Sequence, residues 1–283
     1  MSKKKSKKSK IQNLVAISDL HAGCRMGLCP PGKIRLDDGG FYIHSEMQAK
    51  MWTMWKNFWT WVKHELKGAP FTVVLNGDAV DGVHHNSVHQ ISHNLADQAN
   101  IAYTCLAPVV DLCNGNYFHI RGTEAHAGAS GQEEERLARR LGAIPGEQGE
   151  YARWELWYRL DWALIHIAHH IGTSSSMAYE TSAVQKELEQ LLVESVTWDE
   201  DPPDVVVRSH RHRCIETRRP WKKGLQTACV TPAWQLKTPF AYKIAGGRRT
   251  QPQIGGTLIR MGDEGIYTKH KVWSLTRSKE VSL

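Results

Sequence analysis

Five short segments of this chain end in residue types that ligate metal ions, and this arrangement constrains the fold more than any other feature. The first segment, residues 11–18 (IQNLVAIS), is aliphatic and too short for an exposed helix, so it is predicted to be a buried strand. Residues 71–76, 117–121 and 204–208 have the same character. The polar residues at the five segment ends are Asp19 and His21; Asp78 and Asp81; Thr123, Glu124 and His126; His169 and His170; and His210 and His212.

These polar ends are expected to meet. Strand ends along one edge of a sheet are where α/β folds gather their sites. On extended backbone alternate residues point the same way, so Asp19 and His21 can face one metal ion or two adjacent ones. A single Asp-Gly after a strand is usually only a turn, whereas five such ends in one chain predict a shared site.

Helical segments alternate with the strands. Ser45 and Gln48 resemble a capping box, and the apolar residues that follow at helical spacing predict a helix of about five turns ending near Leu66. The alternation predicts an α/β fold in a single layered domain, residues 11–283, whose C-terminal part is basic and rich in strands. Further helices are predicted at 92–112, 132–141 and 177–194, and a hairpin at 154–160 and 163–169.

Charge is distributed unevenly along the chain, whose net charge is +7. Residues 1–10 carry 6 lysines, residues 11–207 hold 14 Lys and Arg against 25 Asp and Glu, and residues 208–283 hold 16 against 4. This asymmetry favours nucleic acid as a partner, reached through the basic residues 208–223 and the Lys-rich tail. For residues 1–10 alone, the alternative is a disordered tail that serves solubility. The cations of the basic stretch, which surround Trp221, are Arg208, Arg211, Arg213, Arg218, Arg219, Lys222 and Lys223.

The six cysteines show no CxxC pairing, which is typical of free thiols in a cytoplasmic protein. Cys24 and Cys29 lie close to His21 in the sequence, which would also allow a zinc site. The chain has no apolar run of the roughly 20 residues that span a bilayer and no apolar stretch behind its N-terminus, so we expect no membrane association.

The ordered series of segment ends resembles the calcineurin-like metallophosphoesterase superfamily, whose motifs run D-x-H, G-D-x-x-D, G-N-H-D/E, a lone His and G-H-x-H. Here they read SDLH, NGDAVDG, RGTEAH, IAHHIG and RSHRH, between residue 14 and about residue 215. The third motif is also similar to that of phosphoesterases encoded by bacteriophages. The resemblance implies a two-layer β-sandwich flanked by helices, the αββα arrangement, with two divalent metal ions in the loops at one end.

Carried over position by position, the resemblance implies that Asp19, His21 and His212 ligate the first metal ion. Asp78 would bridge both ions, and Asp81 would orient a ligand or a positioning loop.

The second ion would be held by His169 and His210, with Thr123 at the position of the usual asparagine. The adjacent His170 is the alternative to His169, because two neighbouring histidines leave the register open.

The third motif departs from the family at two positions. Thr123 replaces an asparagine ligand with a weaker one, and Glu124 replaces the histidine that assists the leaving group. Glu124 could therefore ligate the second ion in place of Thr123, and His126 could supply the lost acid. His84 and His85, beyond the second motif, compete with His126 for that role.

The activity that this resemblance implies is metal-dependent phosphoester hydrolysis by a hydroxide that bridges two divalent ions. Manganese is the expected metal, and iron, zinc and nickel also suit the Asp and His ligands. The basic residues and Trp221 favour a phosphodiesterase or nuclease acting on nucleic acid. The alternatives are a phosphomonoesterase for a small molecule or phosphoprotein, and a nucleic-acid-binding protein with a degenerate metal site.

Overall fold

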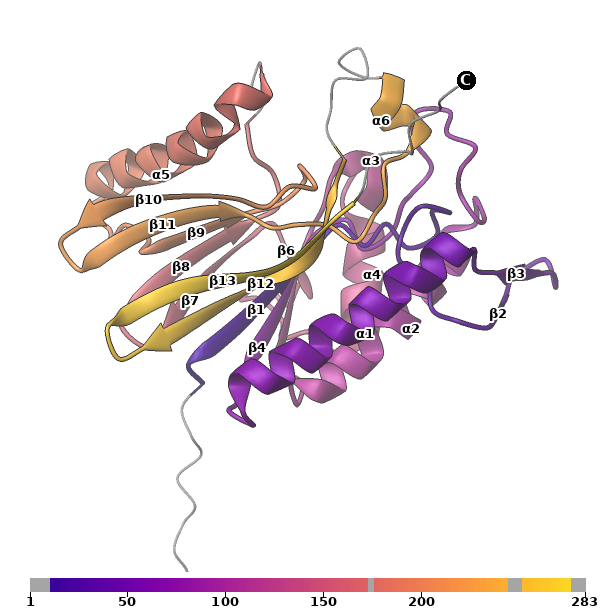
Figure 1. Cartoon of the computed structure of the whole chain (residues 1–283), viewed down its shortest axis with the longest axis horizontal. Coiled ribbons are helices and arrows are strands. Elements are labelled where there is room, and N and C mark those ends of the chain that lie inside the picture. Colours follow the sequence, from indigo (N-terminus) through magenta and orange to yellow (C-terminus); the bar gives the residue numbers. More distant parts are fainter. Residues whose placement is uncertain (1–10, 173–175, 244–250, 276–283) are drawn as a thin grey trace, which may run out of the picture.

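Two β-sheets form the centre of the molecule. The computed structural model describes residues 11–172, 176–243 and 251–275 (Figure 1). The first sheet has the order β13-β12-β1-β4-β5-β6 and the second the order β10-β11-β9-β8-β7. The strands of the first sheet are β1 (Asn13–Ile17), β4 (Thr72–Asn76), β5 (Tyr117–Ile120), β6 (Ala152–Arg153), β12 (Gln253–Gly262) and β13 (Gly265–Ser274). Those of the second are β7 (Glu155–Leu160), β8 (Ala163–Ala168), β9 (Val205–Arg208), β10 (Ile215–Trp221) and β11 (Gly224–Val230).

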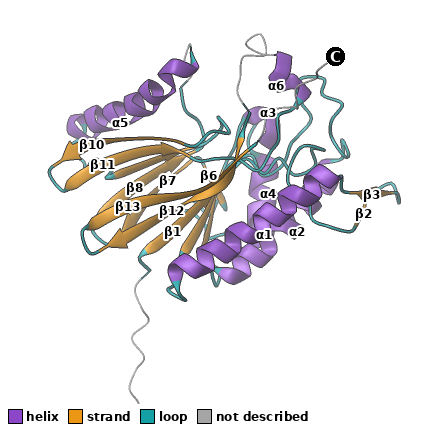
Figure 2. Ribbon diagram, in the orientation of Figure 1, coloured by secondary structure: helices purple, strands orange, loops and turns teal. Residues whose placement is uncertain are grey.

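Helices cover the outer faces of both sheets, as Figure 2 shows. The first sheet packs against α1, α2 and α4, and the second against α5. The predicted α/β fold, a two-layer β-sandwich flanked by helices, is therefore confirmed. The helices are α1 (Glu46–Leu66), α2 (Leu95–Leu112), α3 (Glu124–Ala127), α4 (Gln132–Leu141), the 3-10 turn η1 (Met177–Tyr179), α5 (Glu180–Thr197) and α6 (Pro239–Lys243).

The aliphatic run of β1, residues 14–17, reflects burial on both faces of the strand. Leu14 and Ala16 point into the core between the two sheets, whereas Val15 and Ile17 point into the core under α1 and α2. This follows from the two-residue period of a strand. The polar residue of β1 is Asn13 at its start, whose Nδ2 donates to Pro70 O at 3.0 Å, and polar side chains return only after the strand ends.

Helix α1 begins as predicted, with a capping box in which Gln48 N donates to Ser45 Oγ and Ser45 N to Gln48 Oε1. Its buried face includes Trp55, whose ring lies edge-on to Trp234 with centroids 4.8 Å apart. The local capping chemistry and the apolar stripe agree on the same helix, which explains why the sequence predicts its start correctly.

Strand direction brings the polar segment ends together. β1, β4 and β5 pair in parallel, and so do β8, β9 and β11, so the C-terminal ends in each set point the same way. The two sheets are joined at this end by Asn76, whose Nδ2 donates to Ala168 O at 3.0 Å and to Ser209 Oγ at 2.7 Å. The loops that follow the strands therefore converge on one region.

Several elements were not predicted, or were predicted with other bounds. The hairpin of β2 (Lys33–Arg35) and β3 (Phe41–Ile43) and the short helices α3 and α6 were missed, because they lack a sustained apolar period. The helix predicted at 177–194 is α5, which is preceded by a 3-10 turn and runs to Thr197. Residues 1–10, the predicted disordered tail, lie outside the described residues. Among the described residues, no helix is both long and apolar enough to cross a membrane.

Candidate metal centre

The structure brings the predicted ligands into two groups whose ligand atoms lie within 4.8 Å of one another. They come from loops that the two sheets direct to the same place, since Asp19 N donates to Gly77 O at 3.0 Å and Ser209 N to His169 O at 2.9 Å. The first group is Asp19, His21 and His212, and the second is Asp78, His169 and His210.

In the first group three side-chain atoms face one point. His212 Nε2 lies 3.2 Å from Asp19 Oδ1 and 3.2 Å from His21 Nε2. His21 Nε2 lies 3.8 Å from the same carboxylate oxygen. Asp19 Oδ1 is buried and accepts no hydrogen bond in the described structure. Two imidazole nitrogens and a buried carboxylate oxygen are a fitting donor set for a divalent cation.

In the second group the Thr123 hydroxyl occupies the centre. Its Oγ1 lies 3.2 Å from Asp78 Oδ2, 3.3 Å from His169 Nε2 and 3.1 Å from His210 Nδ1. His169 Nδ1 donates to Asn76 O at 2.7 Å, which directs Nε2 at Asp78 Oδ2, 3.1 Å away. A carbonyl that fixes the tautomer in this way is usual for metal-ligating histidines.

Asp78 lies between the two groups. Its Oδ2 is 3.1 Å from His169 Nε2 in the second group and 3.9 Å from His21 Nε2 in the first. Its Oδ1 accepts a hydrogen bond from Thr123 N at 2.7 Å, which fixes the carboxylate in this position. Asp78 is thus placed where one carboxylate can contact cations in both groups.

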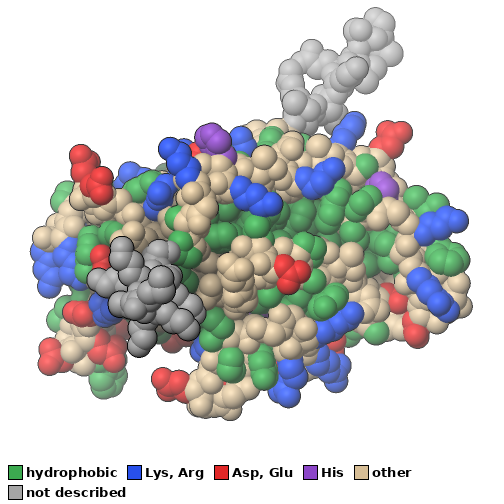
Figure 3. Space-filling model, turned by 90° about the horizontal axis from the view of Figure 1, so that it is seen from below, with side chains coloured by type: hydrophobic (Ala, Val, Ile, Leu, Met, Phe, Trp, Pro, Cys, Tyr) green, Lys and Arg blue, Asp and Glu red, His purple; other side chains and the backbone are tan. Residues whose placement is uncertain are grey.

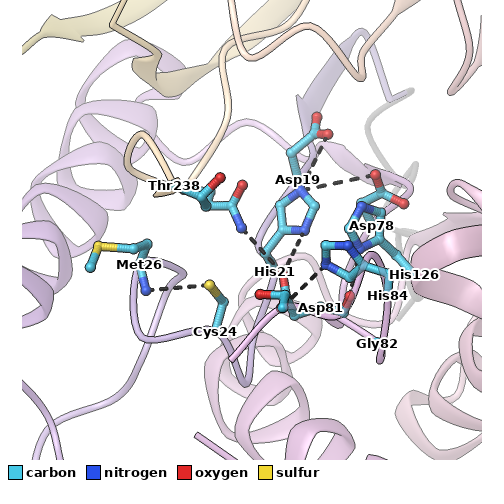
Figure 4. Close-up of polar contacts among 12 residues, drawn as sticks. Asp19, His21, Cys24, Met26, Asp78, Asp81, Gly82, His84, His126 and Thr238 are labelled. Carbon is cyan, nitrogen blue, oxygen red and sulfur yellow. Dashed lines mark hydrogen bonds and ion pairs between the residues drawn. The ribbon is translucent and has the colours of Figure 1, made fainter. Parts of the chain in front are cut away.

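A third group lies beside the first and contains His21, Asp81 and His126 (Figure 4). His21 Nδ1 faces Asp81 Oδ1 at 3.3 Å, so Asp81 is placed to orient the His21 ring. His126 donates from Nδ1 to Asp81 O at 2.5 Å, and its ring lies edge-on to His21 with centroids 4.5 Å apart. His84 Nε2 lies 3.6 Å from Asp81 Oδ2.

Two glutamines that the sequence analysis missed hold the Asp81 carboxylate. Gln90 Nε2 donates to Asp81 Oδ2 at 2.9 Å, and Gln235 Nε2 lies 3.3 Å from Asp81 Oδ1. Both side chains are buried although they lie in loops. No motif in the sequence marks them, because they reach Asp81 from 9 and 154 residues away.

The backbone of the site is held in an unfavourable conformation. Asp19, His21, Asp78, His210 and His212 all have positive φ, between 44° and 70°. For a residue with a side chain this conformation costs about 1–3 kcal/mol and persists only where its surroundings impose it. Five such residues in two adjacent groups of ligands indicate that the loops are shaped for function.

Two glycines allow the close packing of these loops. At Gly122, an added Cβ would lie 2.0 Å from Asp78 Oδ1 and 2.3 Å from Asp78 N. At Gly77, which has φ +81°, it would lie 2.4 Å from His169 Nδ1. Only glycine lets the ends of β4 and β5 approach Asp78 and His169 this closely.

The charges of the site call for a cation. Asp19, Asp78 and Asp81 are at most 2% exposed. Among the described residues, these carboxylates form ion pairs with histidines only. Burial by itself raises the pKa of Asp78, but His169 and the other imidazoles outweigh burial and hold this pKa well below its usual range. Buried carboxylates that stay ionised require compensating positive charge.

The imidazoles respond in the opposite direction. Burial lowers the pKa of His21, but Asp19 and Asp81 outweigh burial and raise it to about 10. Burial likewise lowers the pKa of His169, and Asp78 raises it to about 9. Positive charge is therefore strongly favoured at these two rings, either as a proton or as a bound cation. For His126 burial prevails and lowers the pKa to about 4.

Some predicted residues are not brought into these groups. Glu124 is exposed on α3 and belongs to none of the three. His170 is also exposed, and His169 takes the position that the sequence left open between them. Cys24 and Cys29 are buried free thiols that join none of the three groups, so the structure does not bring them together with His21 as zinc ligands.

Most cations of the basic stretch 208–223 contact acidic side chains. Arg208 is buried, and its Nε donates to Glu187 Oε2 of α5 at 3.0 Å. On the face shown in Figure 3, lysines and arginines are dispersed among acidic residues and do not form one patch. The other ion pairs of this stretch are Arg213–Glu180, Arg218–Glu216, Arg219–Glu189 and Lys223–Asp204.

No protein-family model matches this chain, and no curated protein sequence matches it. Several solved structures are similar in shape. A Vps29 mutant from Entamoeba histolytica matches with 10% identity and a TM-score of 0.37, over 93% of this chain and 99% of that one. Vps29 complexed with zinc, from the same organism, matches with 9% identity and a TM-score of 0.36, over 92% and 98%. Thermus thermophilus sulfate thiohydrolase SoxB matches with 12% identity and a TM-score of 0.39, over 93% of this chain and 56% of that one. These scores are low, so the architecture described above rests on the strand order of this chain itself.

Proposed function

We propose that this protein is a metal-dependent phosphoester hydrolase of the calcineurin-like type, with a centre for two divalent cations. The observation that carries this proposal is the convergence of buried carboxylates and imidazoles on two adjacent points, with Asp78 between them. Two cations held there would polarise the phosphoryl group and lower the pKa of a bound water to about 7. The mixed oxygen and nitrogen donors suit manganese, iron, zinc or nickel.

The residues of the chain have distinct tasks in this proposal. Asp19, His21 and His212 hold the first cation; Asp78, Thr123, His169 and His210 hold the second. In hydrolysis, the oxygen of a water molecule bonds to phosphorus and gives up a proton, the bond to the leaving oxygen breaks, and the leaving oxygen takes up a proton. His126 is the nearest imidazole outside the two groups of ligands, so we assign it the proton transfer. Its low pKa keeps it neutral at pH 7, and the negative charge of a bound phosphoester would favour the proton it must gain.

Substitution of the bridging carboxylate tests the proposal. Asp78→Asn should lower manganese-dependent hydrolysis by about 100-fold or more, because the amide cannot neutralise two cations. Asp263→Asn is the matched control, since Asp263 is exposed in the turn between β12 and β13. Circular dichroism should show both variants folded. An Asp78→Asn variant with full activity and unchanged metal content would refute the bridging role.

The substrate class is the finer part of the proposal. We favour a phosphodiester, with nucleic acid as the principal candidate and a phosphate monoester as the alternative. Manganese-supplemented assays on a monoester, a simple diester, and single- and double-stranded DNA separate them. Turnover of the monoester alone would select the phosphatase. If none of these substrates is hydrolysed, the remaining alternative is a nucleic-acid-binding protein with a degenerate metal site. The replacements at Thr123 and Glu124 are the reason for considering this alternative.

A further inference from the structure

A row of rings leads outward from the metal centre. His126 lies edge-on to His21, and His84 lies edge-on to His126 with centroids 4.4 Å apart. His85 follows at 5.0 Å from His84, and Phe240 stacks on His85 at 4.5 Å with an interplanar angle of 27°. The row therefore connects a proposed ligand of the first cation to Phe240, an aromatic side chain on α6.

The outer end of this row is held in place by its backbone. His85 and the adjacent Asn86 both have φ of 50°, a conformation that non-glycine residues seldom adopt. His84 Nδ1 and His85 Nδ1 lie 2.8 Å apart and share a hydrogen bond. Two successive strained residues are typical of loops shaped for binding, and here they set the ring of His85 against Phe240.

Aromatic surface remains accessible beyond His85. Phe240 is 36% exposed although His85 stacks against it, and Tyr242, two residues further on α6, is 52% exposed. Lys237 Nζ lies 4.0 Å from the centre of the Tyr242 ring. Residues 237–243 (KTPFAYK) contain two lysines and no acid. Exposed rings beside cations are what proteins use to stack bases and to follow a phosphate backbone.

We propose that Phe240 and Tyr242 form a platform that stacks a nucleobase of the substrate while one of its phosphodiesters lies at the metal centre. This inference rests on the proposed function and assigns its substrate class as an oligonucleotide. A small phosphomonoester would end near His126, whereas the platform begins three ring contacts further out. An oligonucleotide, with its repeated phosphates and planar bases, can reach both the metal centre and the platform.

Binding of two matched oligomers tests the platform. Hexathymidylate and an abasic hexamer with the same phosphates carry the same charge, so they differ only in the bases. The wild-type protein with manganese should bind hexathymidylate about 10-fold more tightly, which corresponds to stacking of a single base. Phe240→Ala should remove most of this preference, and Phe240→Tyr should keep it. Fluorescence anisotropy gives the affinities, and electrophoresis checks that the oligomers stay intact.

Phe41→Ala is the control variant, because Phe41 is an aromatic residue that is more exposed than Phe240, at 62%, and lies on the separate hairpin β2–β3. It should leave both affinities unchanged, and thermal melting should show every variant folded. Equal affinity of the wild type for both oligomers, or an equal loss of both in Phe240→Ala, would overturn the platform. Manganese-dependent hydrolysis of a simple diester distinguishes the failures: if it persists, only the platform is wrong, and if it too is absent, the proposed function is wrong as well.

Discussion

Thr123 and His169 show how single residues define this site. The threonine hydroxyl contacts Asp78, His169 and His210, so it takes the centre of the second group. His169 rather than His170 turns inward because its Nδ1 finds the Asn76 carbonyl. Neither outcome depends on residue type alone, since a neighbouring atom selects each role.

At the residue scale we predict that cation binding releases protons. The pKa of His21, raised to about 10, and that of His169, raised to about 9, mean that both rings carry a proton at pH 7 when no cation is bound. Manganese must displace these two protons, so about two protons should leave when both cations bind, and the apparent affinity should rise with pH until about pH 10. Calorimetry in buffers of different protonation enthalpy counts these protons.

His270→Gln is the control for this experiment. Burial lowers the pKa of His270, but Cys214 and Glu216 raise it to about 9, and the residue lies outside the three groups of ligands. This variant should release as many protons as the wild type. Cation binding that neither releases protons nor varies with pH would contradict the charge balance described for His21 and His169.

At the scale of elements, α4 and β5 support the loop that carries Asp78. Glu134 of α4 accepts a hydrogen bond from Ala79 N at 2.9 Å with Oε1, and its Oε2 pairs with His119 Nε2. His119 Nδ1 in turn lies 2.8 Å from Tyr117 Oη. All three side chains are fully buried. Their contacts therefore fix the position of Ala79, the residue that follows Asp78.

Removal of this support should destabilise the protein. Glu134→Ala leaves buried partners unsatisfied and should reduce the free energy of unfolding by about 3 kcal/mol. Glu133→Ala, one residue away, breaks an ion pair with Arg136, which is mostly exposed, and should cost less than about 1 kcal/mol. Denaturant titration measures both values. Similar losses of unfolding free energy in the two variants would show that the buried contacts of Glu134 stabilise the protein no more than a partly exposed ion pair does.

At the scale of the whole molecule, ion pairs use much of the positive charge in the basic stretch 208–223. Arg208, Arg213 and Arg219 bind glutamates of α5, so they join the outer helix to the second sheet. Charge that stabilises the fold in this way is less available to a polyanion. If the protein binds nucleic acid as proposed, we therefore expect the lysines of residues 1–10 and those near α6 to contribute more to the affinity than the paired arginines.

Salt dependence tests this distribution. The logarithm of the affinity for DNA should fall linearly with the logarithm of salt concentration, with a slope of about −0.9 for each phosphate contact. Deletion of residues 1–10 should make this slope shallower, whereas Arg219→Gln should change it little because Arg219 is already paired with Glu189. If deletion of residues 1–10 leaves the salt dependence of the affinity unchanged, these residues do not contact the DNA, and the alternative role in solubility remains.

The sequence by itself determined the main elements and the donors of the site. β1, α1 and α4 follow from aliphatic runs, capping residues and helical period, which act over a few neighbours. The order of the motifs predicts that Asp19, Asp78 and His169 belong to one site, and the structure places their side chains in two adjacent groups. Only the tertiary structure decided that Glu124 stays outside, that Gln90 and Gln235 hold Asp81, and that most basic side chains of 208–223 are paired. The reason is physical: local patterns depend on adjacent residues, whereas ion pairs, ligand choice and the row of rings to Phe240 depend on how distant loops pack.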